Sequence, residues 1–162
     1  MCSSDLERAS RQRALILANP GGVLVCLTVI LPGAVKRDDR SRKVAASALM
    51  AVRERLSPVL EECLDLETGF EGYFIVRGDT FYVKRVCCQI EDSHPFGRLM
   101  DLDVIELSGG VACPVGRDRI GEEPRCCLVC GRPARECMRS CKHSRDELLQ
   151  KVDEILSNPN NL

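Results

Sequence analysis

The stretch EDSHPFGRLMDLDVIEL, residues 91–107, contains the segment around which the fold can be deduced. Within it, an apolar run over 99–107 carries two aspartates, Asp101 and Asp103, one residue apart. In a β-strand, residues i and i+2 point to the same face, so a strand here places both carboxylates side by side. The apolar residues between and after them then turn into the core. The sequence therefore predicts a strand that displays a pair of acids on one face.

Two carboxylates at this spacing repel each other and resist joint ionisation unless a cation lies between them. Enzymes of phosphoryl and nucleotidyl transfer use carboxylate-bound Mg²⁺ for this purpose, and Mg²⁺ prefers a few carboxylates plus substrate phosphates. Just before the pair, Gly97 permits close backbone approach and Arg98 suits bidentate binding of phosphate oxygens. Two interpretations stay open: a magnesium site at Asp101 and Asp103, or a D-x-D string on a solvated strand face.

The bulk composition limits the class of protein. The 162 residues carry 23 Lys+Arg and 24 Asp+Glu, a net charge of −1, whereas nucleic-acid-binding proteins usually have a basic excess. Only 4% of residues are aromatic, with no Trp, which leaves no base-stacking platform. We find no apolar run near the ~20 residues of a membrane span and no signal-peptide core at the start. We expect one cytoplasmic domain, residues 1–162, that binds neither nucleic acid nor membrane.

Apolar runs at strand and helix spacing predict an α+β fold, with a mixed or antiparallel sheet flanked by helices. The expected strands, rich in β-branched and aromatic residues, are 23–31, 72–77, 80–90 and 99–107. The expected helices are 4–18, 41–66 and 144–156. Pro58 breaks or kinks the second helix, Gly-Asp at 78–79 predicts a tight hairpin, and Ser-x-x-Glu at 144–147 is a capping box. Residues 113–143, rich in Cys, Arg, Pro and Gly, form a loop-rich segment.

Eleven cysteines, an odd number, without a secretory signal indicate reduced thiols, some of them candidate metal ligands. Four residues follow the pattern C-x2-C-x6-C-x5-H, namely Cys127, Cys130, Cys137 and His143. Three thiolates and one imidazole suit tetrahedral Zn²⁺, which would staple a segment that lacks its own core. Cys126 and Cys141 are alternative ligands, and His143 is also a candidate for substrate contact. The competing interpretation is a set of reduced thiols in a Cys-rich chain.

Several strings in the chain resemble the apo-citrate lyase phosphoribosyl-dephospho-CoA transferases, the holo-acyl-carrier-protein synthases of citrate lyase. The resemblance covers nearly the whole chain. It rests on RASRQ (8–12), PGAVK (32–36), TG (68–69), IEDSHPFGRLMDLDVI (90–105), GRDRIGEEPRCCLVC (116–130) and C-x-R-S-C-K-H (137–143).

The resemblance implies transfer of a prosthetic group from 2′-(5″-triphosphoribosyl)-3′-dephospho-CoA to a serine of the acyl carrier (γ) subunit of citrate lyase, with release of diphosphate. It also implies a nucleotidyltransferase fold of the polymerase-β type. The Gly-Ser…D-x-D motif of that fold is compressed or absent here, since Gly97-Arg98 stands three positions before Asp101. Two alternatives remain: a related transferase for another carrier, such as that of malonate decarboxylase, and a non-catalytic, zinc-stapled protein-binding module.

The family strings also imply roles for individual residues. Asp101 and Asp103 would hold Mg²⁺, while Glu91 would complete the metal site or take the serine proton, with His94 as the other candidate base. The residues implied to contact substrate, chiefly its phosphates, are Gly97, Arg98, Lys36, Arg117, Arg125 and His143.

Overall fold

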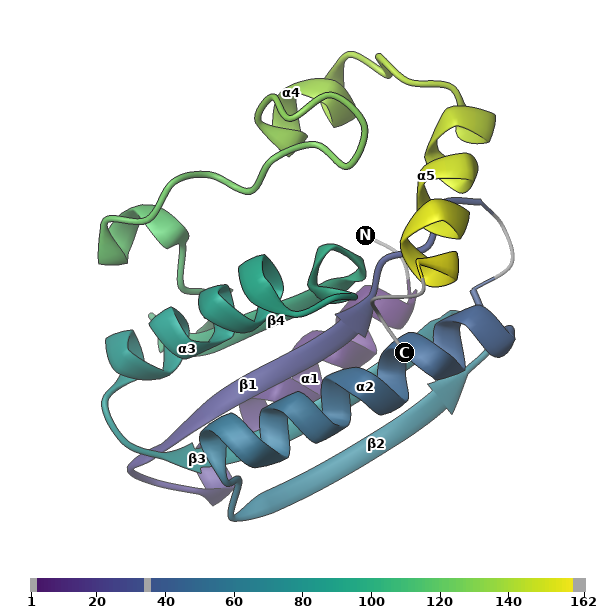
Figure 1. Cartoon of the computed structure of the whole chain (residues 1–162). Helices are drawn as coiled ribbons and strands as arrows, with labels where there is room; N and C mark the ends of the chain where they lie inside the picture. Colours follow the sequence, from purple (N-terminus) through teal and green to yellow (C-terminus); the bar gives the residue numbers. More distant parts are fainter. Residues whose placement is uncertain (1–2, 34–35, 159–162) are drawn as a thin grey trace.

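The computed structural model describes residues 3–33 and 36–158, and within them a five-stranded sheet lies at the centre of the molecule (Figure 1). The strands are β1 (Gly22–Val29), β2 (Leu60–Leu66), β3 (Gly69–Arg77), β4 (Met100–Ser108) and β5 (Val111–Pro114). Their order is β2-β3-β1-β4-β5, and every neighbouring pair is antiparallel. The predicted α+β class is confirmed, with the antiparallel form of the sheet.

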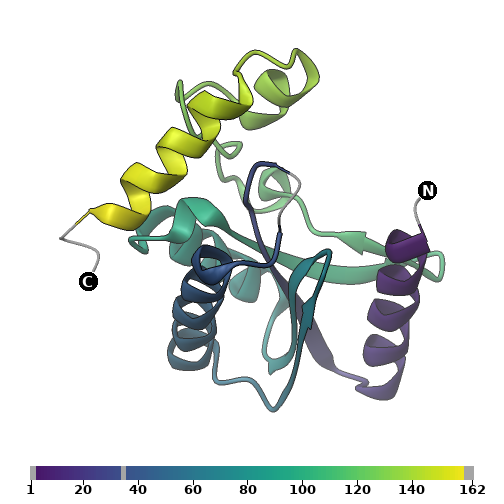
Figure 2. The same ribbon diagram turned by 90° about the vertical axis from the view of Figure 1, so that its right-hand side faces the viewer.

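Helices cover both faces of this sheet. The helices of the described residues are α1 (Ser3–Ala18), α2 (Asp39–Leu56), α3 (Thr80–Ser93), α4 (Ala134–Arg139) and α5 (Arg145–Ser157), with short 3₁₀ turns at Gly97–Leu99 and Arg117–Ile120. Figure 2 shows the sheet between α1 on one side and α2 on the other, with α4 and α5 beyond one end of the sheet. No helix among the described residues is long and apolar enough to cross a bilayer.

The central strand β1 is buried on both faces, as its uninterrupted apolar run predicts. Val25 and Leu27 belong to the larger core cluster, which includes residues of α2 and α3. Leu24 and Cys26 point to the opposite face, where Leu15 of α1 packs. The helices predicted over 4–18 and 144–156 and the strand over 99–107 are likewise confirmed, including the capping box between Ser144 and Glu147.

The strand predicted over 80–90 is wrong, because these residues form helix α3. Thr80, Phe81 and Val83 favour strands individually, but Asp79 caps a helix by accepting hydrogen bonds from the backbone N–H groups of Phe81 and Tyr82. The Gly-Asp pair at 78–79 is therefore a helix start and not a hairpin turn.

The helix predicted over 41–66 is also wrong beyond Leu56. Ser57 adopts a left-handed conformation, with φ of 46°, and Pro58 cannot continue the helical hydrogen bonds. The chain then turns back as β2, an edge strand that pairs with β3. Strand β5 was not predicted at all, since its four residues carry too short a pattern.

The Asp79 cap supplies a test of the helical assignment. Asp79→Ala is expected to lower the free energy of unfolding by about 1 kcal/mol, because two N–H groups at the start of α3 lose their acceptor. Asp79→Asn keeps an acceptor oxygen and should stay within a few tenths of a kcal/mol of the wild type. Urea denaturation measures both, and an unchanged Asp79→Ala protein would contradict the cap.

Candidate active site

Asp101 and Asp103 lie on β4 and share the face of the sheet that α1 covers. Their side chains are 41% and 43% exposed, whereas Leu102, between them, is fully buried on the α2 and α3 side. In the sheet, Asp101 is opposite Thr28 and Asp103 is opposite Cys26 of β1. The strand thus holds the two carboxylates on a fixed backbone, partly open to solvent.

The part of β4 that carries the aspartates has an open edge. Among the described residues, β5 pairs with β4 only from Ile105 onward. Two side chains of α3 replace the missing strand: the Glu91 carboxylate accepts a hydrogen bond from the Leu102 N–H (2.7 Å), and Lys84 Nζ lies 3.4 Å from the Leu102 carbonyl. Lys84 Nζ is also 3.7 Å from Asp103 Oδ1. Glu91 and Lys84 are each only 4% exposed, so both charged groups are built into the interior.

Arg117 and Arg125 balance the buried Glu91. Arg117 Nη2 donates to Glu91 Oε2 at 2.6 Å, and the same guanidinium forms two bonds to Asp92. Burial opposes the charge on Arg117, but these hydrogen bonds outweigh it and raise its pKa. Arg125 Nη1 lies 3.4 Å from Glu91 Oε1. Because both oxygens of Glu91 are engaged in this way, its geometry supports the strand and gives no support to a role as metal ligand or base.

Arg98, just before β4, donates hydrogen bonds to the Cys-rich segment, and Arg125 of the Cys-rich segment donates hydrogen bonds back to the start of β4. We call this pair the arginine clamp. Arg98 donates to the carbonyl oxygens of Cys126 (3.1 Å) and Cys127 (2.8 Å). Arg125 donates to the carbonyls of Gly97, Arg98 and Met100 at 2.6–3.1 Å. Its Nη1 also lies 3.4 Å from Asp101 Oδ1. The clamp therefore reaches from the Cys-rich segment to one of the two aspartates.

Gly97 lies where the chain passes very close to α3. A Cβ atom added there would lie 2.4 Å from the backbone oxygen of Glu91 and 2.5 Å from that of Ile90. Close packing against the end of the helix therefore explains the glycine without any substrate.

His94 is not brought to the aspartates, and Lys36 makes its hydrogen bond within its own loop. His94 caps the end of α3 and lines a small pocket with α2, on the opposite face of the sheet from Asp101. Its Nδ1 accepts a hydrogen bond from the Phe96 N–H. Lys36 donates to the carbonyl of Leu31 in the loop after β1. Residues 34–35 of the PGAVK string lie outside the described residues.

The charges around the pair act on Asp101 in opposing directions. Burial and the neighbouring Asp103 raise its pKa, whereas Arg125, Lys84 and Arg8 lower it, and the raising effects prevail. Asp101 therefore keeps its proton to higher pH than a free aspartate does. A bound cation would reverse this preference and allow both groups to ionise.

Three residues around the pair are not among the predicted site residues. They are Arg8, Glu71 and Lys84, whose segment is predicted as a strand and which on composition alone reads as a solvated charge. Once 80–93 is read as a helix, Lys84 and Glu91 stand seven residues apart on its buried face, which is a detectable signal. Arg8 of α1 and Glu71 of β3 form a partly buried ion pair at 2.5 Å on the same face of the sheet as the aspartates. They are 63 residues apart in sequence, so no local pattern connects them.

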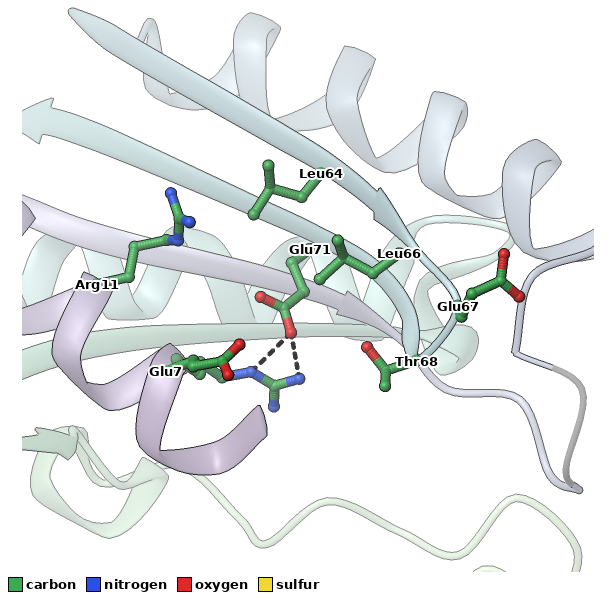
Figure 3. Close-up of a pocket in the computed structure, with 8 residues that line it drawn as sticks. Glu7, Arg11, Leu64, Leu66, Glu67, Thr68 and Glu71 are labelled. Atoms are coloured by element: carbon green, nitrogen blue, oxygen red, sulfur yellow. Dashed lines mark hydrogen bonds and ion pairs between the residues drawn. The ribbon is translucent and has the colours of Figure 1, made fainter. Parts of the chain in front are cut away.

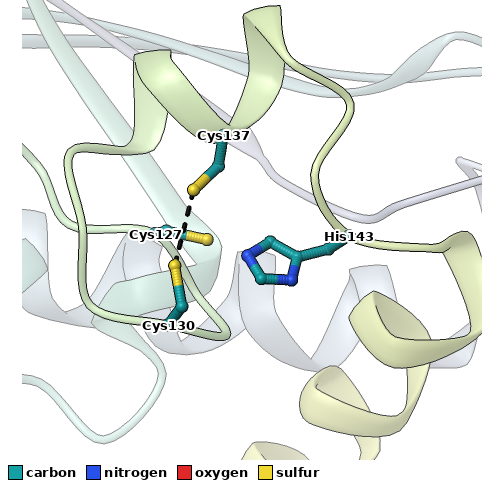
Figure 4. Close-up of side chains that lie close together, drawn as sticks. All are labelled: Cys127, Cys130, Cys137 and His143. Atoms are coloured by element: carbon teal, nitrogen blue, oxygen red, sulfur yellow. Dashed lines mark hydrogen bonds between the residues drawn. The ribbon is translucent and has the colours of Figure 1, made fainter.

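The predicted metal ligands come together in the Cys-rich segment (Figure 4). One ligand atom from each of Cys127, Cys130, Cys137 and His143 lies within 4.8 Å of all the others. His143 Nε2 is buried and has no hydrogen-bond partner among the residues that the structure describes. Figure 4 shows the ring turned toward the three sulfur atoms.

The chemistry of this cluster suits zinc. The backbone N–H of Arg132 is the main group that lowers the pKa of Cys130, to about 5, so a thiolate is available there. Cys126 and Cys141, the alternative ligands, are exposed and lie outside the cluster. The four residues fit a tetrahedral S₃N site for Zn²⁺, and the orphaned imidazole nitrogen is the strongest sign of it.

The fold and the site define an α+β protein with a strand-borne carboxylate pair, basic groups around it and a zinc-compatible Cys/His cluster beside it. The family model of apo-citrate lyase phosphoribosyl-dephospho-CoA transferase matches residues 4–159, so the chain belongs to this family. Its named members are transferases, and this protein is accordingly an enzyme of the transferase class. The resemblance inferred from the sequence strings is confirmed.

Individual relatives agree with the family. A "Probable apo-citrate lyase phosphoribosyl-dephospho-CoA transferase" of Streptococcus pyogenes is 33% identical over 154 residues, covering 93% of this chain and 80% of the relative. A protein of the same name from Vibrio cholerae is 36% identical over 138 residues, covering 82% and 76%. "Protein CitXG" of Haemophilus influenzae is 34% identical over 157 residues, which are 94% of this chain but 33% of that longer protein.

The arginine clamp leads to one prediction. Arg98→Ala leaves the aspartates and the Cys/His cluster in place but frees the Cys126 and Cys127 carbonyls. Transferase activity is expected to fall about 10–100-fold, the usual cost of losing a group that supports a ligand. Amide hydrogen exchange over 100–102 should become faster. Arg139→Ala, an exposed arginine on α4, is the control, and equal activity of the two variants would contradict the clamp.

The raised pKa of Asp101 leads to a second prediction. A raised pKa means that the folded protein disfavours the ionised form of Asp101. The unfolded chain does not, so ionisation of Asp101 costs the folded state stability that is lost as the pH rises through the folded-state pKa. Asp101→Asn should therefore raise the free energy of unfolding at pH 7 without divalent cations, and the gain should vanish once the pH falls below the ordinary aspartate range. Denaturant titrations across pH, with exposed Asp118→Asn as control, test this. A loss of stability at pH 7 would refute it.

Proposed function

We propose that this protein attaches the prosthetic group of citrate lyase. The donor is 2′-(5″-triphosphoribosyl)-3′-dephospho-CoA, and the acceptor is a serine hydroxyl of the acyl carrier (γ) subunit. The observation that carries the proposal is the pair Asp101 and Asp103 on a rigid strand, bordered by Lys84, Arg125 and Arg8, in a chain that belongs to this transferase family.

The proposed reaction exchanges one phosphorus–oxygen bond for another. The serine oxygen forms a bond to the phosphorus attached to the donor ribose at C5″, and the bond from that phosphorus to the diphosphate breaks. The serine loses its proton, a phosphodiester links the group to the carrier, and diphosphate leaves. Charge accumulates on the leaving diphosphate, so cationic groups near the pair assist the transfer.

Asp101 and Asp103 are the residues that would hold Mg²⁺. Their placement on one face and the raised pKa of Asp101 fit a site that is completed by a cation. When bound, the ion supplies charge neutralisation for the triphosphate. Lys84 and Arg125, each close to one of the aspartates, keep the carboxylates oriented through bonds to the strand backbone and carry positive charge toward the same place.

The roles of the other predicted residues differ in how well the geometry supports them. Arg98, Arg117 and Arg125 all direct donors to protein acceptors, so we assign them to support of β4 and of the Cys-rich segment. Neither Glu91 nor His94 gains support as the base, because Glu91 is fully engaged and His94 lies across the sheet. We propose that substrate contact comes first from groups on the aspartate face.

We further propose that Cys127, Cys130, Cys137 and His143 bind a structural Zn²⁺. The segment between β5 and α5 supplies few residues to the core, so a metal cross-link compensates for missing apolar burial. Because Arg98 holds the carbonyl of the ligand Cys127, the metal would also anchor the arginine clamp. The enzyme would act in the cytoplasm, where these thiols stay reduced.

The direct test of the proposed function is mass spectrometry of the purified apo-carrier after incubation with this protein, the triphosphoribosyl donor and Mg²⁺. We expect a mass gain equal to the donor minus diphosphate, which disappears without Mg²⁺. Asp101→Asn should reduce the rate by about a hundredfold or more, since it removes charge from the metal site.

Controls make the outcome specific. Asp118→Asn, at an exposed position, should transfer at the wild-type rate. The carrier subunit of malonate decarboxylase should stay unmodified, and its modification would identify the other transferase reaction. No gain on either carrier, with donor and carriers proven competent by another enzyme, would refute the proposal and favour a binding module.

Zinc binding is tested by elemental analysis of the purified protein. We expect about one zinc per chain, the stoichiometry of a single four-ligand site. Cys137→Ser should lose the metal and melt at a lower temperature, whereas Cys63→Ser, at an exposed position on β2, should keep it. A wild-type protein purified under reducing, metal-replete conditions without zinc would contradict the assignment.

A further inference from the structure

A pocket of about 350 Å³ opens between α1 and the β2–β3 hairpin (Figure 3). It lies on the same face of the sheet as the aspartate pair. Figure 3 shows Leu64 and Leu66 of β2 on one side, Glu7 and Arg11 of α1 on the other, and Thr68 at the turn. Glu71 of β3 and Arg8 of α1 complete its inner wall. Its volume is within the range of about 300–1,000 Å³ that small-molecule sites occupy.

The sheet register places this pocket next to the carboxylate pair. Glu71 is opposite Thr28 of β1, and Thr28 is opposite Asp101 of β4, so the three residues form one row across the sheet. Arg8 connects the pocket with the aspartate pair. It lines the pocket and forms an ion pair with Glu71, and it is close enough to Asp101 to lower the pKa of that carboxyl group. A molecule in the pocket therefore has Arg8 beside it, and Asp101 lies further along the same row of the sheet.

Arg8 is held in a fixed orientation. Its Nε and Nη2 both donate to Glu71 Oε1, at 3.0 and 2.5 Å, and the Tyr73 hydroxyl donates to the other Glu71 oxygen. Glu71 is 8% exposed and Arg8 37%, so the carboxylate is buried while the guanidinium reaches the surface. A buried ion pair is an inefficient source of stability, because desolvation offsets most of the attraction. The Arg8–Glu71 pair is therefore better explained by a role in ligand binding, with Glu71 holding the Arg8 guanidinium at the border of the pocket.

The walls of the pocket define what it can accept. Leu64 and Leu66 give an apolar side suited to a flat ring. The remaining lining contains three glutamates against two arginines, which disfavours a second phosphate-rich group. Carboxylates and the Thr68 hydroxyl are instead good partners for sugar hydroxyls. The pocket thus matches a nucleoside, with an apolar side for the base, polar side chains for the sugar, and Arg8 as the cation that reaches toward the aspartates.

We infer that this pocket binds the nucleoside part of the donor, with the base against Leu64 and Leu66 and Arg8 contacting the phosphate that is transferred. The inference rests on the proposed function for the identity of the donor. In that donor a neutral ribose joins the triphosphate to the 2′-oxygen of the adenosine, so the group next to the metal-bound phosphates is uncharged. The donor thus runs from triphosphate through ribose to adenosine, and the protein offers Asp101, then Arg8, then the apolar side at Leu66 in the same order.

The absence of tryptophan from the chain provides a direct probe. Leu66→Trp places a single indole at the pocket, where Leu66 is 38% exposed and a larger side chain can be accommodated. Addition of 3′-dephospho-CoA, without metal or carrier, should change the fluorescence of this variant in a saturable manner. 4′-Phosphopantetheine, which lacks the adenosine, should not.

The matched control is Val59→Trp, an exposed position just before the other end of β2. It should show no change with either compound. In case the indole itself blocks the pocket, calorimetry gives a second measurement. Leu66→Asp should weaken binding of 3′-dephospho-CoA by about tenfold or more through loss of apolar contact, while Val59→Asp should equal the wild type. An unchanged Leu66→Trp signal together with wild-type affinity of Leu66→Asp would overturn the inference.

Arg8 is tested separately, with a variant that leaves no unpaired buried charge. The double substitution Arg8→Ala/Glu71→Gln should raise the KM for the triphosphoribosyl donor about tenfold or more, since one charged hydrogen bond to phosphate is lost. Its affinity for 3′-dephospho-CoA should stay close to that of the wild type. Glu71→Gln alone and Arg13→Ala, an exposed arginine of α1, are the controls. A double variant with wild-type KM would overturn the role of Arg8.

These results separate the inference from the proposed function. If 3′-dephospho-CoA binds at Leu66→Trp but no carrier is modified, the nucleoside pocket stands and the transfer reaction fails. If the carrier is modified while neither pocket variant affects nucleotide binding, the reaction stands and the pocket assignment fails.

Discussion

The site depends on the open edge of β4. Leu102 lies between the two aspartates, and within residues 3–33 and 36–158 no strand pairs with its N–H and C=O, since β5 joins β4 only from Ile105 onward. Unpaired buried backbone groups are costly, so α3 supplies the buried Glu91 and Lys84 as partners. The charge of Glu91 in turn requires Arg117 and Arg125, and Arg125 reaches both Asp101 and the carbonyls before it. The charged side chains around the carboxylate pair, from Glu91 and Lys84 to Arg117 and Arg125, are therefore present because β4 lacks a neighbouring strand at Leu102.

The same constraint connects the two halves of the molecule. Arg98 and Arg125 join the start of β4 to the Cys-rich segment, whose four ligands stand ready for a metal. With the proposed zinc bound, this Cys/His cluster would support the carboxylate site and would also cross-link a segment with little core. On the other side, Arg8 and Glu71 extend the site toward the pocket beneath α1. In our proposals, structural support and substrate contact come from different arginines.

Local patterns allowed much of this to be predicted from the sequence. The apolar run around Asp101 fixes the strand and the face of the acids, and the cysteine spacing identifies all four cluster residues. Helix α3 was misread because its first residues favour strands, which hid the shared face of Lys84 and Glu91. The contacts of Arg98 and Arg125 lie 24–34 residues away, so the sequence could show that arginines were present but not what they bind. Tertiary pairing of this kind leaves no periodic signal.

The central claim is that Asp101 and Asp103 hold a divalent cation together with the donor triphosphate. The most direct measurement is a titration with Mn²⁺, followed by its electron paramagnetic resonance signal, in the presence of the triphosphoribosyl donor. The account predicts saturable binding by the wild type and an affinity about tenfold or more weaker in Asp103→Asn, because the site loses one of its charged oxygen ligands. Equal Mn²⁺ affinity in the two proteins would contradict it.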